Sequence, residues 1–198
     1  MKKSLMIVVM ALSVAVLFSS CGKVPQAEID AAFAALDSAK MAGADVYLAE
    51  DFTALQDSMK AITENVEAQK SKFFANYGDI KEKLAQVTEQ AAATVGKTEA
   101  RKEEVKQEVA ALQAEVATLQ TQNNELVAKA PKGKEGKAAL EAIKADIALI
   151  DTTVGEANTQ IAAGELMPAL DKMKAAKEKA VAINTELNDV IAKYTGKK

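Results

Sequence analysis

The sequence predicts an all-α protein, built as an elongated antiparallel helical bundle or coiled coil. Alanine, lysine, glutamate, leucine and glutamine dominate the composition, and these residues have the strongest helix propensities. Apolar residues recur at steps of three and four over long stretches, whereas alternation with a period of two never lasts more than a few residues. Aromatic residues make up only 4% of the chain and tryptophan is absent, which argues against large packed sheets.

The first two helical segments are expected between residues 25 and 73. The first begins at Pro25, a residue that suits an opening helical turn, and stops at Gly43. The second is a long helix whose apolar seam has one polar interruption, at Gln69. This seam consists of Leu48, Phe52, Leu55, Met59, Ile62, Val66, Gln69 and Phe73.

The third segment follows a turn, in which Gly78 suits a helix C-cap and Asp79 with Glu82 has the form of a capping box. Its seam contains Ile80, Leu84, Val87, Ala91, Thr94, Val105, Val109, Leu112, Val116, Leu119, Asn123 and Leu126. Residues 96–104 offer almost no apolar face, so the helix either breaks at Gly96 or continues as a solvent-exposed connector. We favour one helix of about 50 residues, because a single interior glycine costs only about 1 kcal/mol and no proline intervenes.

Asn123 interrupts the apolar seam of the third segment between Leu119 and Leu126. A polar residue in such a seam can fix the register or the partner number of a coiled coil. The alternative is that Gln122-Asn123-Asn124 marks a fraying helix end ahead of Pro131. We favour the fraying end.

Two more helices are expected after the strongest break of the chain, at residues 131–136. The fourth helix ends at Gly164, and the fifth starts near Pro168. The fourth seam contains Leu140, Ile143, Ile147, Ile150, Val154, Ala157 and Ile161. The fifth contains Leu170, Met173, Ala176, Ala180, Ile183, Leu187, Val190 and Tyr194.

The five segments fit two three-helix units that share the long third helix. Short connections make neighbouring helices antiparallel. The simplest packing that buries every seam then places residues 25–100 in one helical unit and residues 101–198 in a second, with the break at 131–136 inside the second unit.

Residues 1–20 have the order of a secretory signal peptide that is cleaved. Lys2 and Lys3 precede an apolar run that is shorter than the roughly 20 residues needed to span a bilayer, and small residues follow it. The run ends in Ser19-Ser20-Cys21, and Cys21 is the only cysteine of the chain. An unpaired free thiol would be a liability in an oxidising compartment, which favours a modified cysteine.

This segment resembles the lipobox of bacterial lipoproteins, although Phe18 stands where a leucine is usual. The resemblance implies that Cys21 becomes the lipidated, palmitate-bearing N-terminus and that residues 21–24 form a tether. Two or three acyl chains give stable anchoring that a single chain does not. Gly22 is not the aspartate that favours inner-membrane retention, so the resemblance implies an outer-membrane anchor with the body in the periplasm. The inner membrane and the cell surface stay open alternatives.

The composition also limits the chemistry of the chain. It contains no histidine, so a serine or cysteine nucleophile would lack its usual base. Acidic residues interleave with lysines at helical spacing, which is typical of a solvated helix face, and no glycine-rich phosphate loop is present. Without residues 1–20 the chain has 23 basic and 28 acidic residues, a balance that does not attract nucleic acid. We expect no enzyme, no cofactor, no metal site and no nucleic-acid partner.

Two resemblances concern the body of the protein. Residues 27–68, with Ala31-Ala32, Ala34-Ala35, Gly43-Ala44-Asp45 and Tyr47, resemble an alanine-rich helical domain of bacterial envelope lipoproteins, which implies a helical spacer or scaffold. The lipidated cysteine, the alanine-rich body and the lysine-terminated tail are similar to the murein lipoprotein family. That similarity implies Lys198 as the residue joined to peptidoglycan.

Two hypotheses of function follow. The first is a membrane-anchored structural spacer or protein-interaction scaffold of the cell envelope, whose partner is an unidentified envelope protein or peptidoglycan. The second is a helical carrier of a small hydrophobic or lipid ligand. Bulky apolar seams would leave a cavity for a ligand, whereas the alanines of this chain favour close helix contact. Whether the chain forms a homo-oligomer stays open.

Overall fold

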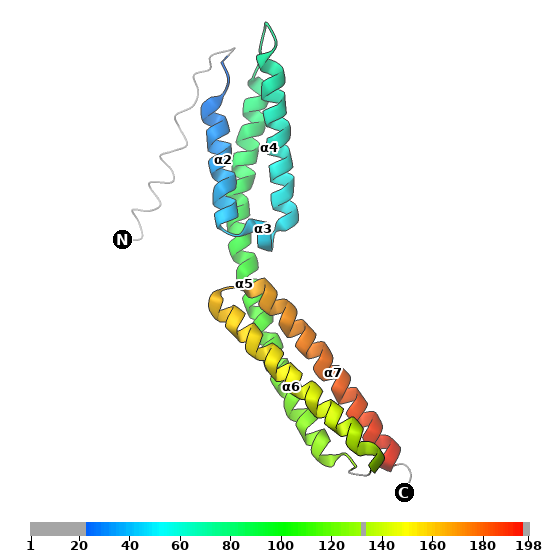
Figure 1. The fold of residues 1–198 in the computed structure, drawn as a ribbon. Helices are drawn as coiled ribbons and strands as arrows, with labels where there is room; N and C mark the ends of the chain where they lie inside the picture. The colour runs from blue at the N-terminus through cyan, green and yellow to red at the C-terminus, as the bar shows by residue number, and fades with distance from the viewer. Residues whose placement is uncertain (1–22, 132–133, 196–198) are drawn as a thin grey trace, which may run out of the picture. The chain divides into compact units, whose positions relative to one another are not determined.

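The structure is a computed structural model that describes residues 23–131 and 134–195 (Figure 1). The described residues form helices and no strand, so the predicted all-α class is confirmed. The helices are α2 (Gln26–Met41), α3 (Ala44–Tyr47), α4 (Ala49–Lys70), α5 (Gly78–Lys129), α6 (Lys134–Ala163) and α7 (Leu166–Thr195). None of these described helices combines the length and the apolar character needed to cross a membrane.

The α5 helix is continuous over 52 residues, as the sequence predicts. Gly96 lies in its interior, and a Cβ atom at this position would meet no other atom within 4 Å. The chain divides into two compact units, Met1–Lys97 and Thr98–Lys198, so α5 contributes helix to both. Most of residues 96–104 are exposed, as expected for a connector, but Thr98 within this stretch is fully buried.

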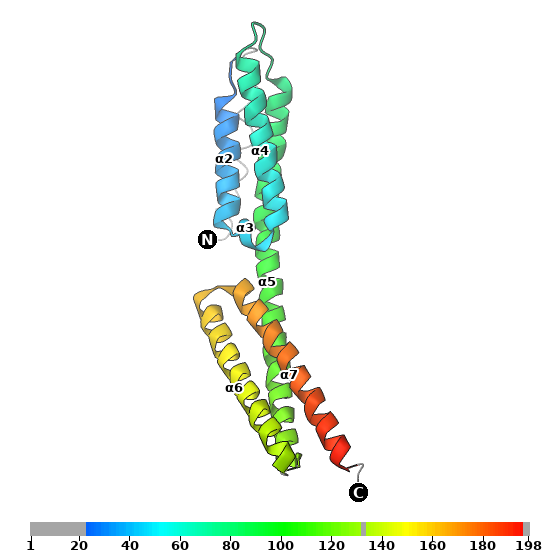
Figure 2. The same ribbon diagram turned by 45° about the vertical axis from the view of Figure 1, so that its right-hand side comes forward.

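The first unit contains α2, α3, α4 and the first half of α5, and Figures 1 and 2 show its three long helices side by side. Its core contains the predicted seam residues from Phe52 to Val66 and from Ile80 to Ala91, together with residues of α2, Ala44 of α3 and Tyr77 of the loop before α5. The buried members are Ala32, Leu36, Ala39, Ala44, Phe52, Leu55, Met59, Ile62, Val66, Tyr77, Ile80, Leu84, Val87 and Ala91. Since α2 and α5 start at the same end of this unit, Lys81 Nζ lies 2.9 Å from Glu28 Oε1.

The α2 helix stops at Gly43, as predicted, because this residue adopts a left-handed backbone with φ of 88° that favours glycine. The short α3 helix that follows was not expected. Its four residues are too few to show a helical repeat in the sequence. Pro25 is buried and stands just before the first residue of α2, so it precedes the helix that it was expected to open.

The loop between α4 and α5 corrects two predictions. The α4 helix ends at Lys70, so Phe73 does not belong to its seam and is 94% exposed. Gly78 opens α5 and does not cap α4, and its N–H donates to Asn76 Oδ1 over 3.0 Å. An asparagine side chain that accepts from the backbone two residues later forms a turn of its own, and this turn replaces the capping box expected at Asp79.

The second unit contains the rest of α5 with α6 and α7, and both views show α6 and α7 as an antiparallel hairpin beside it. The hairpin turns at Gly164, whose φ of 80° again favours glycine. Pro168 lies in the first turn of α7, where its missing N–H costs no helical hydrogen bond. Core residues come from all three helices: Val116, Leu140, Ile143, Ile147, Ile150, Ala176, Ala180, Ile183 and Leu187.

Candidate functional site

The two site residues expected from the sequence, Cys21 and Lys198, lie outside the described residues, as does the predicted signal peptide at residues 1–20. The described residues start at Lys23, two residues after Cys21, and α2 starts at Gln26. A fully extended chain spans at most about 3.5 Å per residue. A group attached to Cys21 therefore stays within about 20 Å of the first turn of α2.

Asn123 is a fully buried polar side chain in the second unit. It has no exposed surface, its Nδ2 donates to the carbonyl oxygen of Ala180 over 2.8 Å, and its Oδ1 accepts from Asn184 Nδ2 over 2.9 Å. The favoured interpretation as a fraying helix end is wrong, since α5 continues to Lys129. The contacts fit the other alternative, in which a buried asparagine fixes the register of packed helices.

Charged side chains join α7 to both of its neighbours in the second unit. Lys174 Nζ lies 2.9 Å from Glu108 Oε1 of α5, and Lys179 Nζ lies 2.7 Å from Asp146 Oδ1 of α6. Two further pairs repeat this arrangement, Lys177 with Glu115 and Lys172 with Glu156. Because all these side chains are partly exposed, each pair stabilises the unit by at most about 1 kcal/mol and contributes mainly to the alignment of the helices.

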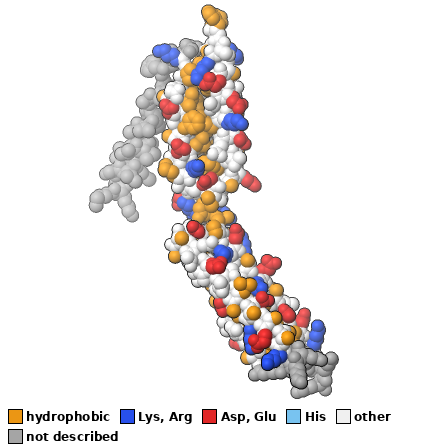
Figure 3. Space-filling view, in the orientation of Figure 1, with side chains coloured by type: hydrophobic (Ala, Val, Ile, Leu, Met, Phe, Trp, Pro, Cys, Tyr) orange, Lys and Arg blue, Asp and Glu red, His pale blue; other side chains and the backbone are white. Residues whose placement is uncertain are grey.

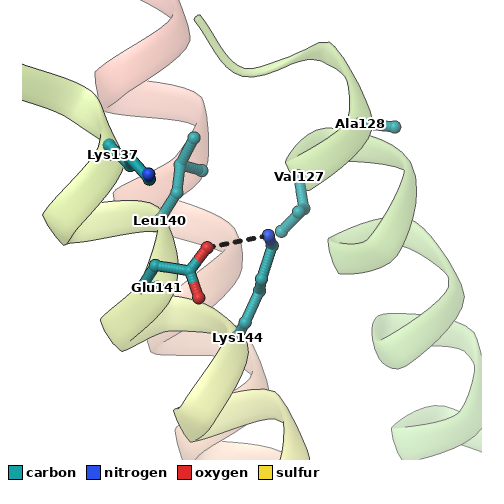
Figure 4. Close-up of a pocket in the computed structure, with 6 residues that line it drawn as sticks. All are labelled: Val127, Ala128, Lys137, Leu140, Glu141 and Lys144. Carbon is teal, nitrogen blue, oxygen red and sulfur yellow. Dashed lines mark hydrogen bonds and ion pairs between the residues drawn. The ribbon is translucent and has the colours of Figure 1, made fainter. Parts of the chain in front are cut away.

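A groove of about 430 Å³ lies in the second unit between the end of α5 and the start of α6 (Figure 4). Val127 and Leu140 form apolar parts of its wall. Lys144 Nζ pairs with Glu141 Oε1 over 3.1 Å, and Lys137 adds a second amine from the same helix. The groove therefore combines apolar side chains with the amines of Lys137 and Lys144 and the carboxylate of Glu141, groups that can contact a ligand.

A second groove, of about 320 Å³, lies between α2 and α4 of the first unit. Phe33, Leu36, Phe52 and Met59 supply its apolar surface, and Figure 3 shows hydrophobic side chains along the middle of this unit. Asp37, Lys40 and Lys60 stand at its margins. Phe33 is 47% exposed and adjoins the other apolar side chains of the groove, so this groove is a candidate contact surface.

Among the described side chains, the most exposed aromatic ones lie in the loop between α4 and α5. Phe73 is 94% and Phe74 87% exposed, and their rings meet edge to face with centroids 5.0 Å apart. We call residues 70–76, with the sequence Lys-Ser-Lys-Phe-Phe-Ala-Asn, the aromatic tip. The tip was not predicted from the sequence, because Phe73 continues the apolar repeat of the preceding helix. The adjacent Phe74, the flanking lysines and the turn residues that follow were the signals that the helix ends here.

Glu28, in the first turn of α2, is a carboxyl whose pKa is changed by a contact with another helix. The hydrogen bond from Lys81 lowers the pKa of the Glu28 carboxyl below its ordinary value of 4.5, against a smaller opposing effect of burial. The pair ties the first turns of α2 and α5 together.

Among the described residues, no three histidine, cysteine, aspartate or glutamate side chains lie close enough together to hold a metal ion. No protein-family model matches the chain, and neither a curated protein nor a solved structure matches it. The candidate sites are therefore defined by their geometry alone. They are surfaces that can contact a partner: the α2–α4 groove, the groove of Figure 4 and the aromatic tip.

Proposed function

We propose that this chain is a bacterial envelope lipoprotein, anchored by a lipid on Cys21, whose helical body acts as a structural spacer or protein-interaction scaffold. The observation that carries the proposal is the order of basic, apolar and small residues that ends in Ser19-Ser20-Cys21. The start of α2 at Gln26 supports it, because only a short tether separates the anchored residue from the folded body.

The scaffold part of the proposal is supported by how the helices pack. Fully buried alanines occur in both units, among them Ala32, Ala39 and Ala91 in the first and Ala157 and Ala180 in the second. Small residues at these positions let helix backbones approach closely and leave the core filled. Exposed contact surfaces then remain on the outside of the units, where a protein or cell-wall partner can reach them.

Replacement of Cys21 by serine tests the anchor. The expected result is that Cys21→Ser protein moves from the outer-membrane fraction to the soluble periplasm, because no acyl chain remains to hold it. Mass spectrometry of the N-terminal peptide should show a diacylglyceryl group on Cys21 in the unchanged protein and cleavage after Ser20. Recovery of an unmodified Cys21 thiol from the membrane-bound protein would contradict the proposal.

In-cell crosslinking of the anchored protein tests the scaffold. Photo-crosslinking residues placed at Phe33 and at Lys40, on the α2–α4 groove, should capture one defined envelope protein or peptidoglycan. The same residue placed at exposed Glu115 of the second unit provides a matched control for unspecific capture. Small-angle scattering of the chain from residue 22 checks the elongated arrangement that the sequence predicts. No adduct from the groove, combined with a globular scattering profile, would contradict the scaffold.

A carrier of a small hydrophobic ligand is the second candidate, and the apolar wall of the α2–α4 groove is the observation that favours it. Its volume of about 320 Å³ lies at the lower end of the range for small-molecule pockets. Native mass spectrometry of the protein purified from cells should then show a bound lipid that is lost in Phe33→Asp protein.

The resemblance of the tail to the murein lipoprotein family implies a further link, from Lys198 to peptidoglycan. Treatment of purified sacculi with muramidase should release the protein, and Lys198→Ala should abolish this fraction.

A further inference from the structure

We propose that the aromatic tip inserts into the surface of a phospholipid bilayer, with Phe73 and Phe74 between the acyl chains and Lys70 and Lys72 at the anionic headgroups. This inference rests on the lipid anchor proposed above and extends it. It assigns the first helical unit a second contact with the membrane, in addition to the tether at Cys21.

The apolar part of this contact is the pair of phenyl rings. Phe73 and Phe74 are 94% and 87% exposed, more than any other large apolar side chain described. The next aromatic residue of the loop is not exposed in this way, since Tyr77 is 5% exposed and belongs to the core of the unit. The loop thus buries one aromatic residue and presents two to the outside, which is the arrangement of an apolar contact site.

The charged part of the contact favours a bilayer over a second copy of this chain. The aromatic tip contains two lysines and no acidic residue. Lys70 pairs with Glu67 over 2.6 Å, but both side chains are about half exposed or more, so the pair is open to solvent and to other anions. Long basic side chains that flank apolar rings suit the boundary between headgroups and acyl chains, whereas two tips facing each other would bring like charges together.

The tip lies at the same end of the first unit as the start of α2. The bilayer that it contacts is therefore the one that holds the anchor. The salt bridge from Glu28 to Lys81 places the first turn of α2 beside the first turn of α5, which directly follows the tip. Figures 1 and 2 both show the start of α2 and the α4–α5 loop at the same end of this unit. Cys21 precedes Lys23 by two residues, a reach of at most about 7 Å. A lipid on Cys21 therefore brings the bilayer to the end of the unit that carries Phe73 and Phe74.

A single-tryptophan experiment tests the insertion directly, because the chain contains no tryptophan of its own. The chain from Cys21 onward is coupled through its only thiol to a maleimide-bearing lipid in vesicles of phosphatidylethanolamine and phosphatidylglycerol. This coupling supplies the anchor whether or not cells lipidate Cys21. Phe73→Trp and Phe74→Trp are the reporters. Met41→Trp is the matched control, because Met41 is 82% exposed and lies at the far end of α2.

The expected result is that Phe73→Trp and Phe74→Trp emission shifts to shorter wavelength and is quenched when the vesicles carry brominated acyl chains, while Met41→Trp emission is unchanged. Equal emission from tip and control reporters, whether quenched or not, would overturn the proposal. So would quenching that depends on protein density, since that indicates contact between copies. These outcomes are independent of the anchor proposal, which fails only if Cys21 from cells carries no lipid.

Free protein provides a second measurement without any anchor. The chain from residue 22 should bind vesicles that contain phosphatidylglycerol, and Phe73→Ser should lower the partition coefficient roughly tenfold through the loss of one buried phenyl ring. Met41→Ser should leave the coefficient unchanged. Lys70→Gln with Lys72→Gln should weaken binding to these vesicles and remove its dependence on salt. Partitioning that is the same for Phe73→Ser and Met41→Ser protein would contradict insertion of the tip.

Discussion

At the level of single residues, buried polar groups specify how the helices pair. Asn123 is the clearest case, because a fully buried amide is tolerated only when its hydrogen bonds are satisfied. Its side chain links α5 to α7 through Ala180 and Asn184. Asn188 extends this network of side-chain hydrogen bonds, since its Nδ2 donates to Asn184 Oδ1 over 2.9 Å. Apolar contacts can slide along a helix, whereas this network is satisfied in one register only.

A double-mutant cycle measures this link. Asn123→Ala should destabilise the protein by about 1–3 kcal/mol, because it removes the buried hydrogen bond to Ala180 and leaves the partly buried Nδ2 of Asn184 without its acceptor. Asn184→Ala alone should cost about 1 kcal/mol. The double variant should be more stable than the sum of the two losses predicts, by at least about 0.5 kcal/mol in urea unfolding. Strict additivity would show that the two amides do not interact.

The pair of Glu28 and Lys81 should make the first unit less stable in acid. A carboxyl whose pKa is lowered in the folded state stabilises that state at pH above 4.5, and this contribution is lost as the pH falls through the lowered pKa. Glu28→Gln should therefore speed hydrogen exchange in α2 at pH 7, by a loss of up to about 1 kcal/mol, and this difference from the unchanged protein should become smaller as the pH is lowered from 4.5 toward 3.

Glu67→Gln is the control for the Glu28 experiment. Glu67 also pairs with a lysine, Lys70, but its side chain is 63% exposed and it joins residues of the same helix. Its replacement should change the exchange of α2 amides at neither pH. A loss at pH 7 that persists unchanged at pH 3 in Glu28→Gln protein would show that the carboxylate charge is not its cause.

At the level of helices, some glycines of this chain lie inside a helix and others lie where a helix ends. Gly96 and Gly155 lie inside α5 and α6 with ordinary helical backbone and open space around them. Gly43 and Gly164 adopt positive φ and end α2 and α6. The residue type is the same in all four cases. What differs is the surrounding sequence, since an uninterrupted run of helix formers follows Gly96 while a short helix or a turn follows Gly43 and Gly164.

Replacement of these glycines by alanine should change the stability of the protein in opposite directions at the two kinds of position. Gly96→Ala and Gly155→Ala should each stabilise the protein by about 0.5–1 kcal/mol, because alanine loses less backbone entropy in a helix and no neighbour obstructs its Cβ. Gly164→Ala should destabilise it by about 1 kcal/mol, because φ of 80° is strained for an L side chain. Thermal unfolding followed by circular dichroism gives all three values. Destabilisation by Gly96→Ala would contradict a continuous, unstrained α5.

At the level of the whole chain, two hydrophobic cores have no member in common. The first is built from α2, α3, α4 and the beginning of α5, and the second from the end of α5 with α6 and α7. Leu84 and Leu187 have no exposed surface and belong to different cores. Each three-helix unit thus has its own source of stability, although one helix runs through both.

Substitutions in one core should therefore act within one unit. Leu84→Ala and Leu187→Ala should each destabilise their own unit by about 2–5 kcal/mol, through lost contacts and the cavity that remains. Hydrogen exchange measured by mass spectrometry should rise in α2 and α4 for the first variant, and in α6 and α7 for the second. Loss of protection across both units from either single change would show that they unfold as one cooperative body.

The sequence by itself determined the helical class, the three-and-four spacing of both cores and the continuity of α5, because these follow from local propensity and from the repeat of apolar residues. It also carries the anchor hypothesis at Cys21, which lies outside the described residues. Only the tertiary structure decided which residues at the margins of that pattern are buried. Asn123 faces a partner helix and is enclosed, while Phe73 continues the repeat beyond the last turn of α4, where no helix packs against it and its ring stays exposed.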